Sequence, residues 1–248
     1  MAIISTPAIV LRSMDHRETS KLAFFFTRRR GKVTGVLKGI RKSPRKFGSG
    51  LEKFSVNDIV YYEYRNSDVH LVSQCDMREC FSAFRGHARR IIAAEYAAEL
   101  VNRIAVAEDP NPAVYDLLVE YFRALCVDRD IDRLVHMFQI KFLALSGFRP
   151  HIDSCVTCGK EISGRTERAG FSMKKGGLVC RRCQGRDFDL WPVSAGMLAT
   201  LLYIEREQWA GCLKLKIPPV IRQELRRVLN SFLVFHLEKN IRSAKYLS

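Results

Sequence analysis

The N-terminal fold of this chain follows from the stretch Leu22-Ala-Phe-Phe-Phe-Thr-Arg-Arg-Arg-Gly-Lys-Val-Thr-Gly-Val-Leu-Lys38. Side chains alternate between two faces over 22–26 and again over 32–38, which is the period-two pattern of β-strands. Arg30-Gly31 between these segments is a turn signal, because glycine tolerates backbone conformations that other residues avoid. The stretch therefore predicts two strands joined by a short turn that carries three arginines.

Three more strand-like segments flank this pair. Apolar and β-branched residues dominate 2–11, 58–64 and 69–73. The polar stretch 39–50 contains Pro44 and three glycines and is typical of a mobile loop. Five short strands in about 75 residues suit a small closed barrel such as an OB-fold. We therefore predict an OB-fold-like β-barrel over residues 1–80, with an open sandwich as the alternative.

After the strand-like segments, apolar residues recur with a helical period, first over 87–106. Asn111, Asp130 and Ser194 are helix-start signals, because their side-chain oxygens can accept hydrogen bonds from the first backbone N–H groups. Pro112 suits the first helical position after Asn111. The sequence therefore predicts an α-helical domain over residues 81–248, and the chain as a whole is expected to be α+β.

Positive charge is concentrated in one segment. The chain has 41 Lys+Arg against 26 Asp+Glu, a formal net charge of +15. Such a balance implies an acidic partner: nucleic acid, an anionic membrane surface or an acidic protein tail. Residues 28–46 contain nine basic residues and no acidic one, and basic side chains can follow a phosphate backbone and release its counterions. The predicted phosphate-binding residues are Arg28, Arg29, Arg30, Lys32, Lys38, Arg41, Lys42, Arg45 and Lys46.

The first four of these residues are favoured, because a strand turn would hold them in place. The alternative is a solvated segment without a ligand, although solubility does not require nine like charges together. Aromatic side chains nearby could stack on bases, but the alternation of strand faces favours core positions for them. These aromatic residues are Phe24, Phe25, Phe26, Tyr61, Tyr62 and Tyr64.

Four of the eight cysteines form two identical pairs, Cys155-x2-Cys158 and Cys180-x2-Cys183, separated by 21 residues. Duplicated pairs of this kind are typical of a tetrahedral zinc site, with four ordinary thiols or a redox pair as alternatives. Cysteine at all four positions leaves no place for water or substrate, so the predicted zinc is structural. We predict a zinc module over residues 149–190, inserted in the helical domain. The other cysteines are expected to be buried thiols: Cys75, Cys80, Cys126 and Cys212.

The sequence contains no P-loop, GxGxxG, HExxH or GxSxG motif. Asp187 and Asp189 form a weak acidic pair. If they bound a metal ion, the protein would be a metal-dependent nuclease, which is the enzyme alternative. No run approaches 18 apolar residues, so no membrane-spanning helix is expected, and the N-terminus does not read as a signal peptide. We expect a soluble, cytosolic protein without an active site.

A second basic cluster lies on the cysteine segment, where acidic residues dilute it. Its simplest explanation is an ordinary mixed surface. A function of another class also stays open, that of a zinc-ribbon RNA-binding or transcription-associated protein.

The order of these parts resembles the RecO family, the bacterial DNA repair and recombination mediators. The similarity covers essentially the whole chain. Its most specific local matches are Ala8-Ile-Val-Leu-Arg12, Glu18-Thr-Ser-Lys21, Gly31-Lys-Val-Thr-Gly-Val-Leu-Lys-Gly39, and Leu145-Ser-Gly-Phe-Arg-Pro150 leading into Cys155-x2-Cys158-Gly159. Not every member of that family keeps the four cysteines, and this chain does.

The resemblance implies a non-enzymatic mediator that binds single- and double-stranded DNA and anneals complementary strands. It further implies that the protein engages the acidic tail of single-strand-binding protein and, with RecR, helps to load RecA onto DNA. Little sequence specificity is expected, because backbone contacts carry no base information. The implied location is the cytoplasm, in association with the nucleoid.

Overall fold

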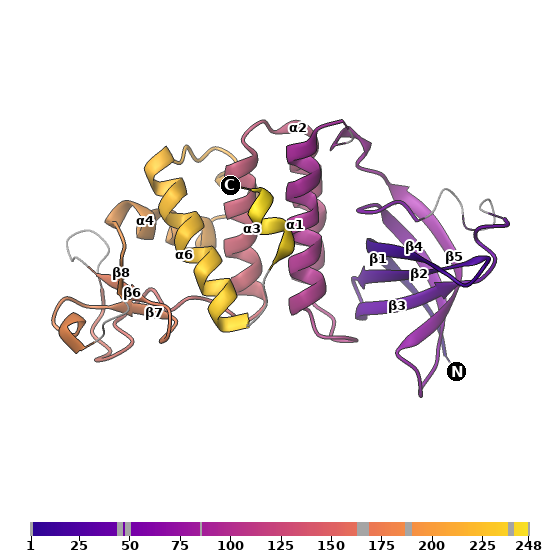
Figure 1. Cartoon of the computed structure of the whole chain (residues 1–248), viewed down its shortest axis with the longest axis horizontal. Coiled ribbons are helices and arrows are strands. Elements are labelled where there is room, and N and C mark those ends of the chain that lie inside the picture. Colours follow the sequence, from indigo (N-terminus) through magenta and orange to yellow (C-terminus); the bar gives the residue numbers. More distant parts are fainter. Residues whose placement is uncertain are drawn as a thin grey trace. The chain divides into compact units, whose positions relative to one another are not determined.

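A computed structural model of the 248-residue chain describes residues 2–43, 47, 51–84, 86–162, 169–186, 190–237 and 241–247. The chain divides into two units, Met1–Arg129 and Asp130–Ser248 (Figure 1). Within the described residues, no helix combines the length and the apolar character needed to cross a bilayer.

The first unit is built on a closed five-stranded barrel (Figure 1). The order around the barrel is β1-β2-β3-β5-β4, and β4 pairs back with β1. Every neighbouring pair is antiparallel except β3 and β5, which run parallel. This closure confirms the predicted OB-fold-like barrel and excludes the open sandwich. The strands are β1 (Ala2–His16), β2 (Ser20–Thr27), β3 (Gly31–Leu37), β4 (Val56–Glu63) and β5 (Val69–Glu79).

Two strands run further than their apolar patterns predict. β1 continues past Leu11 to His16, because its polar end pairs with the start of β2, from Arg12 opposite Phe24 to His16 opposite Ser20. β5 likewise continues past Ser73 to Glu79 by pairing with β4. Backbone hydrogen bonds to a neighbouring strand thus extend an element where the hydrophobic pattern has ended.

Alternate side chains of the strands fill the barrel. One buried cluster unites residues of all five strands with Ile40 and Phe47 from the segment after β3. The strand members of this core are Ala8, Val10, Ala23, Phe25, Val33, Leu37, Ile59, Tyr61, Val72 and Cys75.

Two helices, α1 (Ala88–Ile104) and α2 (Pro112–Val127), and a short 3-10 turn, η2 (Ser82–Phe84), complete the first unit. The Asn111 side chain caps α2 by accepting a hydrogen bond from the Val114 N–H, and Pro112 occupies the first turn, as predicted. Phe122 of α2 packs on Phe54 before β4, with ring centroids 5.4 Å apart. Aromatic contacts therefore fix α2 against the barrel.

The second unit combines helices with a small sheet (Figure 1). The side chains of Asp130 and Ser194 cap α3 and α4, as the sequence predicts. The helices are α3 (Ile131–Leu145), α4 (Ala195–Arg206), α5 (Trp209–Cys212) and α6 (Pro219–Leu237), followed by the 3-10 turn η4 (Arg242–Tyr246). The sheet has the order β7-β6-β8, with β6 (Gly170–Ser172), β7 (Gly177–Val179) and β8 (Leu190–Pro192), and η3 (Gln184–Arg186) lies between β7 and β8.

His136 of α3 is buried in this unit, and neither ring nitrogen has a hydrogen-bond partner within the described residues. Burial lowers the pKa of His136 to about 4. The positive charge of Arg226 lowers this pKa further, and the negative charge of Asp132 opposes the shift. Arg226 and Asp132 form an ion pair of 3.4 Å. The folded unit therefore holds His136 as neutral imidazole.

This histidine makes the stability of the second unit depend on pH. An unfolded histidine titrates near pH 6.5, so the stability is complete above that pH and decreases as the pH falls toward about 4. We expect a loss of about 2 kcal/mol between pH 7.5 and pH 5 that His136→Phe removes. Urea unfolding at both pH values measures it, with His87→Gln, at an exposed histidine, as the control. If the His136→Phe variant lost as much stability between the two pH values as the unmodified chain does, His136 would not be the source of the pH dependence.

Candidate functional site

Two turns of the second unit bring the paired cysteines together. Cys155 and Cys158 lie on one turn, which Gly159 closes with a left-handed backbone (φ +73°) and an N–H donated to the Cys155 carbonyl at 2.8 Å. Cys180 and Cys183 lie on a second turn after β7, where the Cys183 N–H donates to the Cys180 carbonyl at 2.9 Å. Each pair thus projects its sulfurs to one side of its turn.

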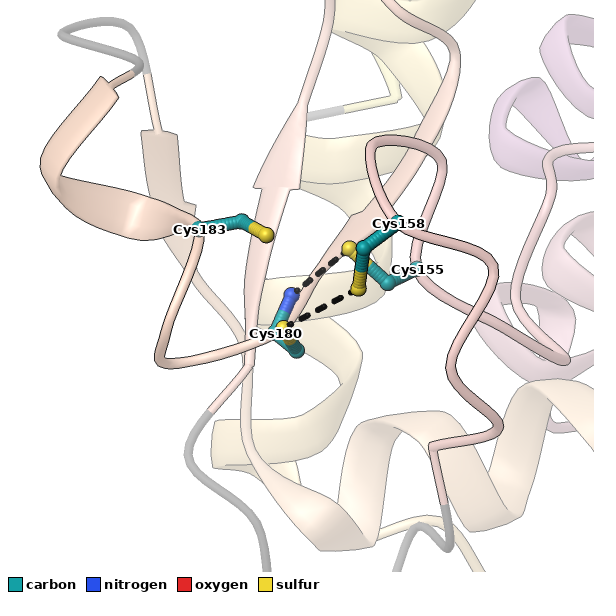
Figure 2. Close-up of side chains that lie close together, drawn as sticks. All are labelled: Cys155, Cys158, Cys180 and Cys183. Carbon is teal, nitrogen blue, oxygen red and sulfur yellow. Dashed lines mark hydrogen bonds between the residues drawn. The ribbon is translucent and has the colours of Figure 1, made fainter.

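The four sulfurs all lie within 4.8 Å of one another. Figure 2 shows the side chains of both turns converging, with Cys158 Sγ and Cys180 Sγ 3.8 Å apart. A tetrahedral ion with metal–sulfur bonds of about 2.3 Å requires sulfur–sulfur separations of about 3.8 Å. The donor set and its spacing therefore fit a thiophilic metal ion, and these residues could hold one.

Backbone groups tune the thiols of this cluster. Burial by itself raises the pKa of Cys155, but N–H groups of Cys180, Thr157 and Cys158 directed at its sulfur lower the pKa to about 6. The Cys180 N–H donates to Cys155 Sγ at 3.3 Å (Figure 2). Burial and the neighbouring thiols raise the pKa of Cys183 to about 12. The surroundings of Cys155 therefore favour its thiolate form, whereas those of Cys183 disfavour ionisation.

The other four cysteines do not belong to this cluster. Cys75 and Cys212 are buried, as predicted, and Cys126 is partly buried. The expectation was wrong for Cys80, which is exposed and donates a hydrogen bond to the Glu52 carboxylate. Cys80 follows the last residue of β5 directly, where the chain leaves the barrel.

The predicted basic turn connects β2 and β3 at one end of the barrel, and its three arginines are exposed. Thr27 Oγ1 accepts the Arg30 N–H at 3.0 Å and donates to the Gly31 carbonyl at 2.9 Å, which ties the turn across its base. The turn also contacts the connection between α1 and α2, where the Glu108 N–H donates to the Lys32 carbonyl at 3.2 Å. These hydrogen bonds hold the backbone of the turn that carries the three arginines.

Nearby acceptors already engage three of these cations. Arg28 donates two hydrogen bonds to Asp116 of α2, at 3.0 and 2.9 Å, and this partner raises the pKa of Arg28. Arg30 lies 4.0 Å from the Glu63 carboxylate. Lys32 Nζ donates to the Asn102 carbonyl, in the last turn of α1, at 2.9 Å.

Arg29 differs from its two neighbours on the turn. Its side chain makes no ion pair with any described residue. Sequence reasoning missed the acids that neutralise this turn. Asp116 lies 88 residues from Arg28, and no local pattern connects them.

The remaining predicted cations follow the other end of β3. Lys38, Arg41 and Lys42 are exposed, and Arg41 lies 3.8 Å from Asp15. The seven residues of β3 span about 20 Å, so this group is that far from the basic turn. Arg45 and Lys46 lie outside the described residues, as do Asp187 and Asp189. The described cations therefore form two groups at opposite ends of the hairpin.

The structure separates the aromatic residues of the barrel. Phe25 and Tyr61 belong to the core, and Phe26 is buried against Tyr115 of α2, with ring centroids 6.5 Å apart. Tyr64, in the loop between β4 and β5, is 37% exposed. Phe24 and Tyr62 are partly exposed.

Gly31 determines how the basic turn sits on the α1–α2 connection. Its φ is +61°, and an added Cβ would lie 2.1 Å from the Asp109 carbonyl oxygen. Gly31→Ala should lower the unfolding free energy by about 2 kcal/mol or more, because backbone strain and a clash combine. Gly39→Ala is the control: its φ is +76°, but its Cβ would meet no atom within 4 Å, so about 1 kcal/mol is expected. Equal losses in urea unfolding would contradict the contact.

Comparison with known proteins covers nearly the whole sequence. Residues 1–81 match the family described as Recombination protein O N terminal, and residues 85–245 match Recombination protein O C terminal. A protein of Alkaliphilus metalliredigens (strain QYMF) named DNA repair protein RecO is 28% identical over 240 residues, 96% of this chain and 95% of that protein. One of Anaeromyxobacter sp. (strain K) with the same name is 30% identical over 244 residues, 98% of this chain and 95% of that protein. With both halves matched, the chain belongs to the recombination protein O family.

Proposed function

We propose that this chain is a non-enzymatic DNA repair and recombination mediator that binds single- and double-stranded DNA and anneals complementary strands. Membership in a family of DNA repair mediators rather than of enzymes supports this proposal. The observation that carries it within the chain is the exposed arginine turn at the end of an OB-fold-like barrel. Such barrels bind nucleic acids through their strands and loops.

Annealing needs no bond to be made or broken by the protein. Two strands repel each other through their phosphates, and a cationic surface that binds both reduces this repulsion. Contacts to phosphates leave the base edges free to pair and carry no sequence information. An exposed arginine turn can supply such contacts.

The predicted cations receive different roles in this proposal. Arg29 is placed to contact phosphate directly, because it is exposed and makes no ion pair within the described residues. Arg28 and Arg30 share their charge with Asp116 and Glu63, so phosphate competes with these carboxylates. Lys32 chiefly positions the turn, since its ammonium already binds the Asn102 carbonyl. Further phosphate contacts are assigned to Lys38, Arg41, Lys42, Arg45 and Lys46.

The protein partners follow from the family alone. We propose that the chain engages the acidic tail of single-strand-binding protein and, with RecR, helps to load RecA onto DNA in the cytoplasm, at the nucleoid. The formal net charge of +15 is compatible with an acidic peptide partner. RNA should not displace DNA preferentially; if it did, the RNA-binding alternative would be favoured.

We further propose that the four cysteines hold a structural zinc ion. Four thiol sulfurs within 4.8 Å of one another can fill all four positions of a tetrahedral ion, which leaves no coordination position for substrate. When bound, the ion would supply a cross-link between the two cysteine turns. Cys155, Cys158, Cys180 and Cys183 would be its ligands.

Removing one of these sulfurs tests the zinc site. Cys158→Ser should lose the metal and lower the melting temperature by on the order of 5 °C or more, because metal binding is coupled to folding of these turns. Metal content per chain and thermal unfolding measure the effect. Cys80→Ser removes an exposed thiol outside the cluster and should change neither. A Cys158→Ser protein that keeps one metal ion per chain would contradict the four-cysteine site.

Salt dependence tests the arginine turn. The triple variant Arg28→Ala, Arg29→Ala, Arg30→Ala should bind single strands more weakly, whatever their sequence. The slope of log K against log salt should shrink by about 2 units, at about 0.7 per phosphate contact. Titration of labelled oligonucleotides at several salt concentrations gives the slope.

Two further variants sharpen this test. Arg129→Ala, Lys214→Ala, Lys216→Ala removes the same charge from exposed positions elsewhere and should leave the slope nearly unchanged. Asp116→Asn should release Arg28 and strengthen DNA binding, whereas Glu120→Gln, one turn along α2, should not. An unchanged slope in the arginine variant, or an equal loss in its charge-matched control, would argue against phosphate binding at the turn.

A further inference from the structure

The loop between β4 and β5 forms a pocket that the arginine turn does not account for. The pocket has a volume of about 410 Å³ and is lined by Glu63, Tyr64, Arg65, Asn66 and Ser67. No described carboxylate, histidine or cysteine cluster of metal-binding type lies there. The lining instead combines an aromatic ring, a guanidinium group, an amide and a hydroxyl.

The strand pairing places this pocket at the same end of the barrel as the arginine turn. β3 and β5 are parallel, and Thr34, the middle residue of β3, pairs with Val69 at the start of β5, so both strands begin at the same end of the barrel. The turn before β3 and the loop before β5 therefore emerge together. The 4.0 Å approach of Arg30 to Glu63 confirms this proximity and offsets the charge of the acid that lines the pocket.

A buried histidine braces the loop. The Tyr64 N–H donates to His70 Nδ1 at 3.3 Å, and His70 is 2% exposed and stacked on Tyr61, with ring centroids 5.3 Å apart. The Ser67 hydroxyl accepts the Val69 N–H at 3.1 Å. The start and the end of the loop are thus fixed to β5, which holds the backbone at Tyr64 in place before a ligand binds.

The side chains of this loop are available for a ligand. Tyr64 is 37% exposed, whereas Tyr61 and Phe25 are core residues and Phe26 lies under α2. Arg65 and Asn66 are exposed, and their side chains make no hydrogen bond to any described residue. An exposed ring beside a free amide and a free guanidinium is the combination that binds an unstacked nucleobase.

We propose that this pocket binds one base of a single DNA strand by stacking on Tyr64 while neighbouring phosphates lie on Arg29 and Arg30. The inference rests on the proposed DNA-binding function and adds the discrimination of single strands from duplex. A base inside a duplex is already stacked on both faces and cannot offer one to Tyr64 without being extruded. Stacking uses the face of the base and leaves its pairing edge open, which suits annealing.

Truncation of Tyr64 tests the proposal. Tyr64→Ala should weaken binding of a single-stranded oligonucleotide by about fivefold or more, the usual cost of a lost base–aromatic stack, and leave duplex binding unchanged. Tyr64→Phe should restore the affinity, because the ring remains. Tyr246→Ala, at a tyrosine of the second unit that is 60% exposed, is the control. The fluorescence of 2-aminopurine in a single strand should be quenched when the strand binds the unmodified chain, and quenched less when it binds the Tyr64→Ala variant.

Two outcomes would overturn the pocket assignment. In one, Tyr64→Ala weakens single-strand and duplex binding equally; in the other, it weakens neither. Failure of the proposed function is a separate result: the arginine variant would then leave the salt slope unchanged whatever Tyr64 does. If the salt slope responds to the arginines and Tyr64 has no effect, the phosphate contacts stand and the base pocket does not.

Discussion

The packing of the β2–β3 turn on the α1–α2 connection is the contact on which the proposed activity depends. Gly31 lacks a Cβ, so the backbone at Asp109 can approach the turn closely, and Lys32 reaches from β3 to the last turn of α1. The barrel closes through three residue pairs between β3 and β5, from Thr34–Val69 to Val36–Leu71. The turns and loops at the ends of a barrel commonly carry recognition, and this contact holds the arginine turn in one orientation.

The net positive charge at the arginine turn is smaller than its three arginines alone would give. Asp116 and Glu63 partly neutralise Arg28 and Arg30, and these exposed pairs are individually weak. A phosphate can therefore replace the carboxylates at small cost, and the carboxylates can take the arginines back when salt or another DNA-binding protein competes. Such reversible binding fits the proposed mediator function, in which DNA would pass to other proteins. A site built for tight, permanent capture would carry fewer competing acids.

Local features of the fold were predictable from the sequence. The period-two pattern predicted β2 and β3, and apolar β-branched segments predicted the other three strands in part. Asn111, Asp130 and Ser194 were recognisable as helix caps. Interactions between distant residues were not predictable. The end of β1 at His16 depends on its pairing with β2, the burial of Phe26 depends on Tyr115 of α2, and the neutralisation of Arg28 depends on a residue 88 positions away. The cysteine spacing predicted the cluster, because two short turns suffice to bring the sulfurs within 4.8 Å. The separation of the basic residues into two groups became clear only from the observed length of β3, which lies between them.

The central claim is that the barrel end formed by the arginine turn and the β4–β5 loop is the DNA-binding surface. Hydrogen exchange of the full chain with and without a short single-stranded oligonucleotide at low ionic strength tests it most directly. Protection should appear in peptides covering 27–32 and 63–68. If the oligonucleotide does not bind, or protects only peptides of the second unit, the claim is wrong.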